Sequence, residues 1–209
     1  MLRPFLSDEA KAALLAASRE IEARSCAEVV ISVRPRSGSY LQVDLALGIA
    51  AGAATTALLC FLPQSFGLLW FVLDPLIAGA LAAFASSRLP RLRRALTPAR
   101  VRHRWSERAA RALFVERRVH ATAGRTGLLV YVSLLERELV LVADLGLEEA
   151  VARAAGWLPA VAALERAVRE GADGLAASRL LLALAAPLAE VLPHRDDDVN
   201  ELADEMDSP

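Results

Sequence analysis

Alternating apolar and polar positions along the chain predict three β-strands. In residues 27–34 every second side chain from Val29 to Val33 is apolar, which is the two-residue period of a strand. Residues 127–135 are apolar at almost every position, so we expect a central strand that is covered on both faces. Residues 138–143 follow a short charged turn and are predicted to return antiparallel to that strand.

Helical spacing of apolar residues predicts four further helices. The first begins after Ser7, whose hydroxyl suits the N-cap position, and the second begins after Thr97 with Pro98 in its first turn. The second helix is expected to bury four residues on one face: Val101, Trp105, Ala109 and Ala112. The predicted ranges are 8–24, 98–120, 157–171 and 174–191, the last with a kink at Pro187.

Two long apolar segments separate the first strand from the second of these helices. Residues 43–62 and 66–86 each contain about 20 residues, and a helix of that length spans about 30 Å of hydrocarbon. The residues between them, Pro63-Gln64-Ser65, leave room only for a tight turn. We therefore predict a two-helix transmembrane hairpin, with the lipid bilayer as one partner of the protein.

Basic residues around the predicted hairpin indicate its orientation. Seven arginines lie between Arg88 and Arg104, whereas the short turn carries no charge. Segments rich in arginine resist translocation, so we expect a multi-pass protein of the bacterial inner (cell) membrane with both termini in the cytoplasm. We also expect no signal peptide, because the first residues lack an apolar core with a cleavage site. The arginines adjoin a membrane segment without interleaved aromatic residues, so no nucleic acid partner is expected.

Composition agrees with a membrane segment. Of the 209 residues 55% are hydrophobic, and the mean hydropathy of +0.37 is above that of ordinary soluble domains. The formal net charge of −1 provides no global field that would attract nucleic acid. Cys26 and Cys60 occur in different settings, so we expect two free thiols and no disulfide.

Four segments of the chain form a characteristic set. They are AEVVISVRPRSGSY before the apolar segments, TAGRTGLLVYVSLLERELVLVADLGL after them, Trp157, and DDDVNEL near the C-terminus. This set resembles the TPM-domain family, and more narrowly its short bacterial members with a transmembrane hairpin inserted in the domain. The resemblance covers nearly the whole chain and implies a three-layer α/β/α sandwich. Phosphatase activity and metal binding have been proposed for some members. In many relatives this domain is extracytoplasmic. This chain differs, because its charges predict that the domain faces the cytoplasm.

The pattern and the resemblance together predict one folded unit into which the hairpin is inserted. Residues 1–40 are the first part of the TPM-like domain, 41–87 the transmembrane hairpin, 88–193 the remainder of the domain and 194–209 an acidic tail. The predicted fold class is α/β, a three-layer α/β/α sandwich with a small mixed sheet, plus the inserted two-helix transmembrane hairpin.

Three charged residues are predicted to meet at one edge of this sheet. If the first two strands are parallel and the third returns antiparallel, Glu28, Arg125 and Asp144 lie at the same edge. They form a candidate ligand or metal site, because Ca²⁺ and Mg²⁺ prefer oxygen ligands and arginine binds phosphate esters. The simpler interpretation is a structural ion pair between Arg125 and one of the acids, with Glu136-Arg137 as a solvated turn at the opposite end.

Other acids are secondary candidates for a site. Besides Glu136, they are the tail residues Asp197, Asp198 and Glu201, which are either solvated or docked on the domain.

Polar and small residues are also present within the predicted hairpin. Asp74 is expected at mid-depth, where a carboxyl group needs a partner, and the hydroxyl of Thr55 or Thr56 is the predicted one. Gly48 and Gly52 form a small-residue face that is expected to pack against residues 78–80.

The sequence supports two functions of different classes. It contains no nucleophile elbow, P-loop, zinc spacing or dinucleotide fingerprint, and it identifies neither catalytic residues nor an oligomeric state. We expect a membrane-tethered TPM-like domain that acts as a binding or accessory module for a membrane-protein partner, in assembly or quality control. The alternative is a metal-dependent phosphatase that acts on phosphate esters with Ca²⁺ or Mg²⁺ at Glu28, Arg125 and Asp144.

Overall fold

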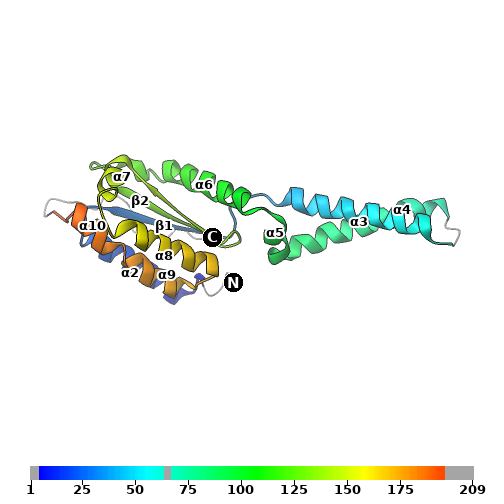
Figure 1. Ribbon diagram of the computed structural model, residues 1–209, viewed down its shortest axis with the longest axis horizontal. Coiled ribbons are helices and arrows are strands. Elements are labelled where there is room, and N and C mark those ends of the chain that lie inside the picture. The colour runs from blue at the N-terminus through cyan, green and yellow to red at the C-terminus, as the bar shows by residue number, and fades with distance from the viewer. Residues whose placement is uncertain (1–4, 64–66, 196–209) are drawn as a thin grey trace. The chain divides into compact units, whose positions relative to one another are not determined.

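Figure 1 shows the computed structural model of the chain, which describes residues 5–63 and 67–195. The chain divides into two compact units, Met1–Ser37 with Arg102–Pro209, and Gly38–Val101. We call the first the α/β unit and the second the hairpin unit. Residues 88–101, which the sequence analysis assigned to the α/β domain, belong to the hairpin unit.

The α/β unit contains a small mixed sheet, as predicted. Its strands are β1 (Glu28–Arg34), β2 (Gly127–Ser133) and β3 (Glu138–Ala143), in the order β1-β2-β3. β1 pairs parallel to β2, and β2 pairs antiparallel to β3. β2 ends two residues before the predicted position, because Leu134 and Leu135 already belong to the turn that leads into β3.

One face of the sheet carries the larger apolar core. Val29, Ile31 and Val33 belong to it, as their alternation predicted. Four helices supply most of the remaining side chains, and Figure 1 shows them on the same face of the sheet: α2 (Asp8–Glu22), α8 (Trp157–Glu170), α9 (Gly174–Leu182) and α10 (Ala185–Val191).

The opposite face carries a second, smaller core with α6 (Ala99–Glu116). Val30, Leu129 and Tyr131 of the sheet pack there with Ala110 and Leu113. The predicted stripe of α6 is wrong by about one residue: Ser106, Ala110 and Leu113 are buried, whereas Ala112 is exposed. Positions 106, 110 and 113 have the same helical spacing as 105, 109 and 112, so apolar periodicity alone does not distinguish two stripes that are one residue apart.

The predicted helix over 174–191 is broken into α9 and α10. The break falls at Ala183 and Leu184, just before Pro187, whose ring cannot donate a helical hydrogen bond to the carbonyl four residues earlier. This segment is long and apolar enough to cross a membrane. Its buried residues Leu181, Leu184 and Leu188 lie in the larger core, so we assign it to the α/β unit.

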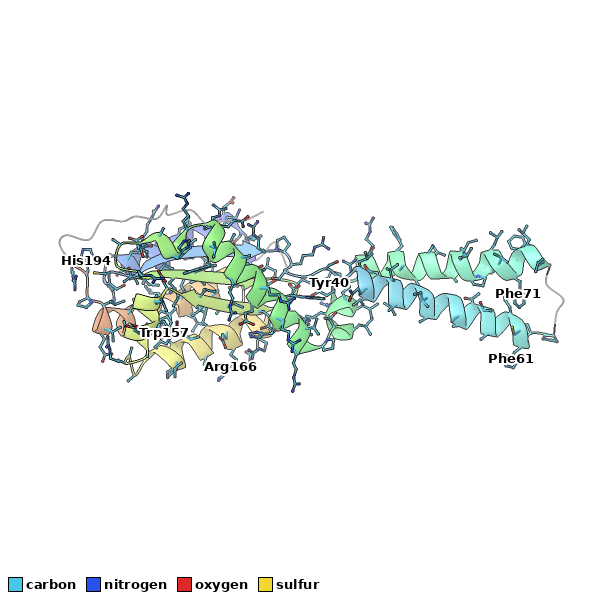
Figure 2. The ribbon with its side chains drawn as sticks, turned by 90° about the horizontal axis from the view of Figure 1, so that it is seen from above. Tyr40, Phe61, Phe71, Trp157, Arg166 and His194 are labelled. Carbon is cyan, nitrogen blue, oxygen red and sulfur yellow. The ribbon has the colours of Figure 1, made fainter. Side chains whose placement is uncertain are left out.

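The hairpin unit consists of α3 (Leu41–Phe61), α4 (Leu68–Arg88) and the short helix α5 (Pro90–Leu96). α3 and α4 are long and apolar enough to span a membrane. A Cβ on Gly48 would lie 2.9 Å from the Gly79 carbonyl oxygen, and a Cβ on Gly52 would lie 3.0 Å from that of Pro75. The predicted small-residue face therefore lets the two backbones approach closely. Outward side chains are exposed, such as Phe61 at 88% (Figure 2).

Candidate functional site

The sheet brings Glu28 and Asp144 to either side of Gly127, as the strand directions predicted. Glu28 is the register partner of Gly127 on β1, and its amide donates to the Thr126 carbonyl at 3.2 Å. On the other side the Asp144 amide donates to the Gly127 carbonyl at 2.9 Å. Both acids are buried, Glu28 being 7% and Asp144 4% exposed.

The Asp144 carboxylate is fully engaged by its neighbours. Its Oδ1 accepts from Arg125 Nη2 at 2.9 Å and from the Leu145 amide at 2.8 Å, and its Oδ2 accepts from Arg125 Nε at 3.3 Å. Asp144 is thereby the N-cap of α7 (Leu145–Val151), a short helix that the sequence analysis did not predict. The structural ion pair is the interpretation that this geometry supports.

The loop before β2 fixes the position of Arg125. The Arg125 amide donates to the Thr122 carbonyl at 3.0 Å, and the Thr126 amide donates to the Thr122 hydroxyl at 3.0 Å. Arg125 adopts a positive φ of 52°, which is uncommon for a residue with a side chain. Gly127 is required for close approach, because a Cβ there would lie 2.0 Å from the Val119 carbonyl oxygen.

A Ca²⁺ or Mg²⁺ ion at these residues would have to displace existing contacts of Asp144. Ca²⁺ takes six to eight oxygen ligands, and Mg²⁺ binds one or two carboxylates together with water. Of the two carboxylates at this edge, Asp144 already accepts from a guanidinium and an amide. Within residues 5–63 and 67–195, no group of three or more His, Cys, Asp and Glu residues is arranged to hold a metal ion. The predicted tail acids Asp197, Asp198 and Glu201 lie outside the described residues.

Glu136 lies at the opposite end of the sheet, as predicted, but its turn is not solvated. Glu136 is 1% exposed, and its Oε1 accepts from the Ser37 amide at 3.1 Å while its Oε2 accepts from the Ser133 hydroxyl at 2.5 Å. The Ser37 hydroxyl lies 2.7 Å from that of Ser133 and 2.8 Å from that of Tyr131. Burial raises the pKa of the Tyr131 hydroxyl, and the Glu136 carboxylate raises it further.

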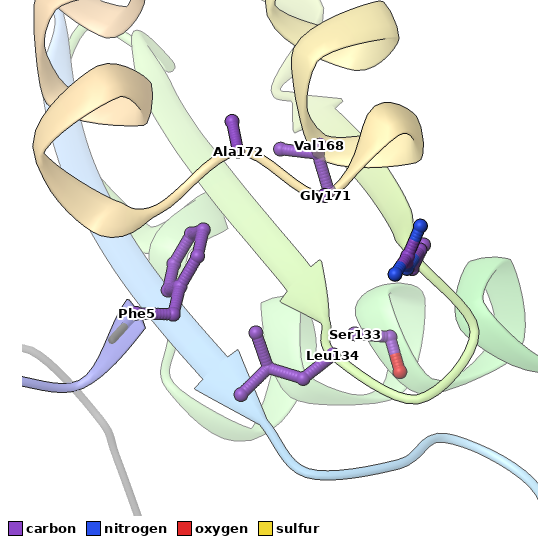
Figure 3. Close-up of a pocket in the computed structure, with 7 residues that line it drawn as sticks. Phe5, Ser133, Leu134, Val168, Gly171 and Ala172 are labelled. Carbon is purple, nitrogen blue, oxygen red and sulfur yellow. The ribbon is translucent and has the colours of Figure 1, made fainter. Parts of the chain in front are cut away.

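Arg137 is half-buried and contacts the end of α8. Its guanidinium donates to the Glu170 carbonyl at 3.4 Å and lies under Gly171, the C-cap of α8, where a Cβ would be 3.1 Å from Cζ. Together with Phe5, Leu134 and other residues it lines a cavity of about 30 Å³ (Figure 3). Ligand pockets usually have about 300–1,000 Å³, so this cavity is a packing defect of the core rather than a binding site.

A larger groove lies beside β3. It has a volume of about 560 Å³ and is lined by residues 139–143 along the strand. His103, Glu107 and Arg111 of α6 line one side, and residues from α7 and α8 line the other, among them Trp157, which Figure 2 labels. This groove was not predicted from the sequence, which indicated only that residues 138–143 return antiparallel to the central strand.

In the hairpin unit the structure does not pair Asp74 with a threonine. Thr55 donates to the Ala51 carbonyl at 2.9 Å and Thr56 to the Gly52 carbonyl at 3.0 Å, which are bonds within α3. Asp74 forms no hydrogen bond with either hydroxyl, so the predicted pairing is not observed, and each threonine bonds its own helix instead.

The acid with partners in this unit is Asp44, which the sequence analysis did not single out. Asp44 is 6% exposed; its Oδ1 accepts from the Ser86 hydroxyl at 2.8 Å and from Arg93 Nε at 3.0 Å, and Arg93 Nη2 bonds the second oxygen. The hydrogen bond with Asp44 raises the pKa of the Arg93 guanidinium, which also lies over the Tyr40 ring. The sequence could have indicated this pair, because Asp44 lies near the start of the first apolar segment and arginines follow the second.

Comparisons with known proteins concern the fold. No family model matches the chain, and no curated protein matches it. The structure is similar to the NMR structure of the BA42 protein from the psychrophilic bacterium Bizionia argentinensis sp. nov., with a TM-score of 0.59 and 14% sequence identity. The similarity covers 99% of this chain and 97% of that chain. At this identity it shows a shared fold alone.

Proposed function

We propose that the protein is a membrane-tethered α/β domain that acts as a binding or accessory module for membrane proteins, in their assembly or quality control. The observation that carries this proposal is the pair of 21-residue apolar helices, α3 and α4, within the chain of an α/β unit. Their exposed side chains include Ile49, Phe61, Leu68 and Trp70. Water disfavours so large an apolar surface, whereas lipid tails accept it.

We also infer that the α/β unit is a three-layer sandwich of the TPM type. Support comes from the two apolar cores on opposite faces of one sheet and from the sequence segments that resemble that family. The short bacterial members that the sequence resembles have a hairpin inserted in the domain, and here the two apolar helices likewise lie between β1 and α6 in the chain. The analogy concerns architecture, and the function has to be tested on this chain.

The proposed location is the bacterial inner membrane, with both termini in the cytoplasm. The arginines between Arg88 and Arg104 support this orientation, because short basic flanks resist translocation. A reporter that is active only in the periplasm and is fused after Pro209 should stay silent, while the same reporter inserted between Gln64 and Ser65 should be active. The opposite pattern would place the α/β unit outside the cytoplasm.

The binding function is tested by crosslinking the full-length protein in its native membranes and identifying what is recovered with it. We expect an integral membrane protein that is absent when an unrelated two-span protein is used as the control. If repeated crosslinking recovers no membrane protein, the binding-module proposal fails. Asp74 has no hydrogen bond or ion pair with any residue the structure describes, so Asp74→Leu is tested in the same assay, and unchanged recovery would exclude a role for this acid in partner contact.

The phosphatase alternative stays a prediction with a direct test. It requires Asp144 to exchange its contacts with Arg125 and the Leu145 amide for a metal ion, and no feature of the geometry favours that exchange. We expect no hydrolysis of a generic phosphate ester by the purified protein with Ca²⁺ or Mg²⁺. Metal-dependent hydrolysis that disappears in Asp144→Asn would overturn the proposed function in favour of the enzyme.

A further inference from the structure

The outer edge of β3 has hydrogen-bonding groups without partners. In an antiparallel pair alternate residues direct both backbone groups toward the neighbouring strand. The Asp144 amide donates to the Gly127 carbonyl, so Asp144 directs its backbone groups toward β2. Val142 and Val140, which are two and four residues earlier and pair with Leu129 and Tyr131, do the same. The amides and carbonyls in between point away from β2; they belong to Leu139, Leu141 and Ala143. Among the described residues these outward groups have no hydrogen-bond partner.

The other edge of the sheet is covered, because every residue of β1 except Arg34 is buried, whereas on β3 only Leu139 is buried. On β1 the outward amide of Val29 donates to the Glu22 carboxylate at 2.9 Å. Just before β1, the Cys26 amide donates to the Leu192 carbonyl at 3.0 Å and Ser25 forms a bridge with Pro193. Proteins usually protect exposed edges with charges, proline or a covering segment. Between Glu138 and Asp144, β3 has only apolar residues and no such protection.

The groove of about 560 Å³ lies along this open edge and provides side-chain contacts as well. Val151, Trp157 and Val161 form an apolar wall on the side of α7 and α8. An extended peptide that adds to β3 would therefore place alternate side chains against this wall and toward α6, while its backbone completes the three outward pairs.

The charges of the groove indicate what such a peptide should carry. Glu107 and Arg111 pair with each other at 2.6 Å, so they contribute little net charge. Glu148 and Glu165 also line the groove, and neither has an ion pair with any residue in the described part of the chain. Two uncompensated carboxylates favour lysine or arginine in an occupant. They disfavour a second copy of this chain, whose β3 would bring the same acids into the interface.

We propose that the groove beside β3 binds an extended apolar segment of another protein, flanked by lysine or arginine, which pairs with β3 as an added strand. This inference rests on the proposed function, because the cytoplasmic flanks of membrane-spanning helices are rich in lysine and arginine. It names the site on the α/β unit where a membrane-protein partner is held, and the chemistry that the site recognises.

Designed peptides test this with the full-length protein in detergent micelles. The probe is a fluorescent peptide of alternating valine and threonine with lysines at both ends. Its controls are the same peptide with glutamates at the ends, and a version with alternate backbone amides N-methylated. We expect the lysine peptide to bind, the glutamate peptide to bind at least about tenfold more weakly, and the N-methylated peptide not to bind. Bound peptide should slow hydrogen exchange at the amides of Leu139, Leu141 and Ala143.

A matched pair of variants locates the site. Glu148 and its neighbour Glu149 are both exposed on α7, but only Glu148 lines the groove. Glu148→Lys should weaken binding of the lysine peptide about three- to tenfold, whereas Glu149→Lys should leave it unchanged. Neither substitution touches the core, so both variants should fold.

Three results would overturn the inference. They are absence of binding by the lysine peptide, equal binding of the N-methylated peptide, and a dimer that forms through β3 and excludes the peptide. Crosslinking in native membranes separates this inference from the proposed function. A membrane-protein partner that crosslinks elsewhere, while the peptide does not bind, would retain the function and reject the groove as its site.

Discussion

At the scale of single residues, four polar side chains at the end of β2 form one hydrogen-bonded group. Tyr131, Ser133 and Glu136 belong to β2 and its turn, and Ser37 joins them from the segment after β1. Tyr131 and Ser133 are almost inaccessible to water. Ionisation of the Tyr131 hydroxyl would therefore place a second charge in a poorly solvated position near the Glu136 carboxylate, which makes the group sensitive to pH.

Alkaline pH should destabilise the protein through Tyr131. Its pKa is raised by burial in the folded chain, so folding is favoured while the hydroxyl keeps its proton. Stability should be retained below about pH 10, the ordinary tyrosine value, and should fall as the pH rises through the higher folded pKa. Chemical unfolding between neutral and alkaline pH measures this loss. Tyr131→Phe should be less stable at neutral pH but should lose less at alkaline pH; an identical slope in both proteins would refute the assignment.

Asp144 and Arg125 should contribute unequally to stability. Asp144→Ala removes the N-cap of α7 and leaves Arg125 without its partner, so we expect a loss of about 1–2 kcal/mol in the free energy of unfolding. Arg125→Ala should cost less than about 1 kcal/mol, because its side chain is 53% exposed and Asp144 keeps the Leu145 amide. Denaturant unfolding of both variants checks this order, and a larger loss for Arg125→Ala would contradict it.

These residues also show how far sequence reasoning reaches. The meeting of Arg125 with Asp144 could be predicted, because strand directions alone bring the ends of neighbouring strands together. The burial of Glu136 could not, because its partner Ser37 is 99 positions away in the chain and no periodic pattern connects them. Likewise the hydroxyls of Thr55 and Thr56 bond their own helix, a local alternative that competes with any partner across the hairpin.

At the scale of elements, the contact between α3 and α4 depends on glycine. Gly48 and Gly79 approach so closely that the Cβ of one would lie 2.9 Å from the carbonyl oxygen of the other. Backbone atoms cannot move away as a flexible side chain can, so a side chain at either position must separate the helices.

Substitution of Gly48 should therefore weaken the hairpin unit. Gly48→Leu is expected to cost about 1–3 kcal/mol, which should appear as a lower midpoint of thermal unfolding in detergent and lower accumulation in membranes. Ala54→Leu on the same helix is the control, because Ala54 is exposed and faces away from this contact. Equal behaviour of the two variants would show that the close approach of the helices contributes nothing to stability.

Elements were predictable where they were long and periodic. The three strands and the helices α2, α3, α4 and α8 follow from apolar periodicity and from the residues at their ends. The seven-residue helices α5 and α7 were missed, because two turns of helix are too short for an apolar stripe to stand out. The buried face of α6 was misplaced, since packing on the sheet, rather than hydrophobicity alone, determines which side chains face inward.

At the scale of the whole molecule, the chain combines a small mixed α/β unit with a pair of apolar helices that lies between β1 and α6 in the sequence. The hydropathy of the chain predicted this division, because the apolar segments differ so clearly from their surroundings. The groove could not be predicted, because its walls come from α6, β3, α7 and α8, and their arrangement is a property of the folded unit.

Extraction of cell membranes tests whether α3 and α4 anchor the α/β unit in a membrane. Membranes that contain the full-length protein are washed with alkaline carbonate, which releases peripheral proteins, and then with detergent. The two helices of 21 residues each should hold the protein in the membrane pellet until the detergent is added. Release of the protein into the carbonate supernatant would show that α3 and α4 do not anchor it.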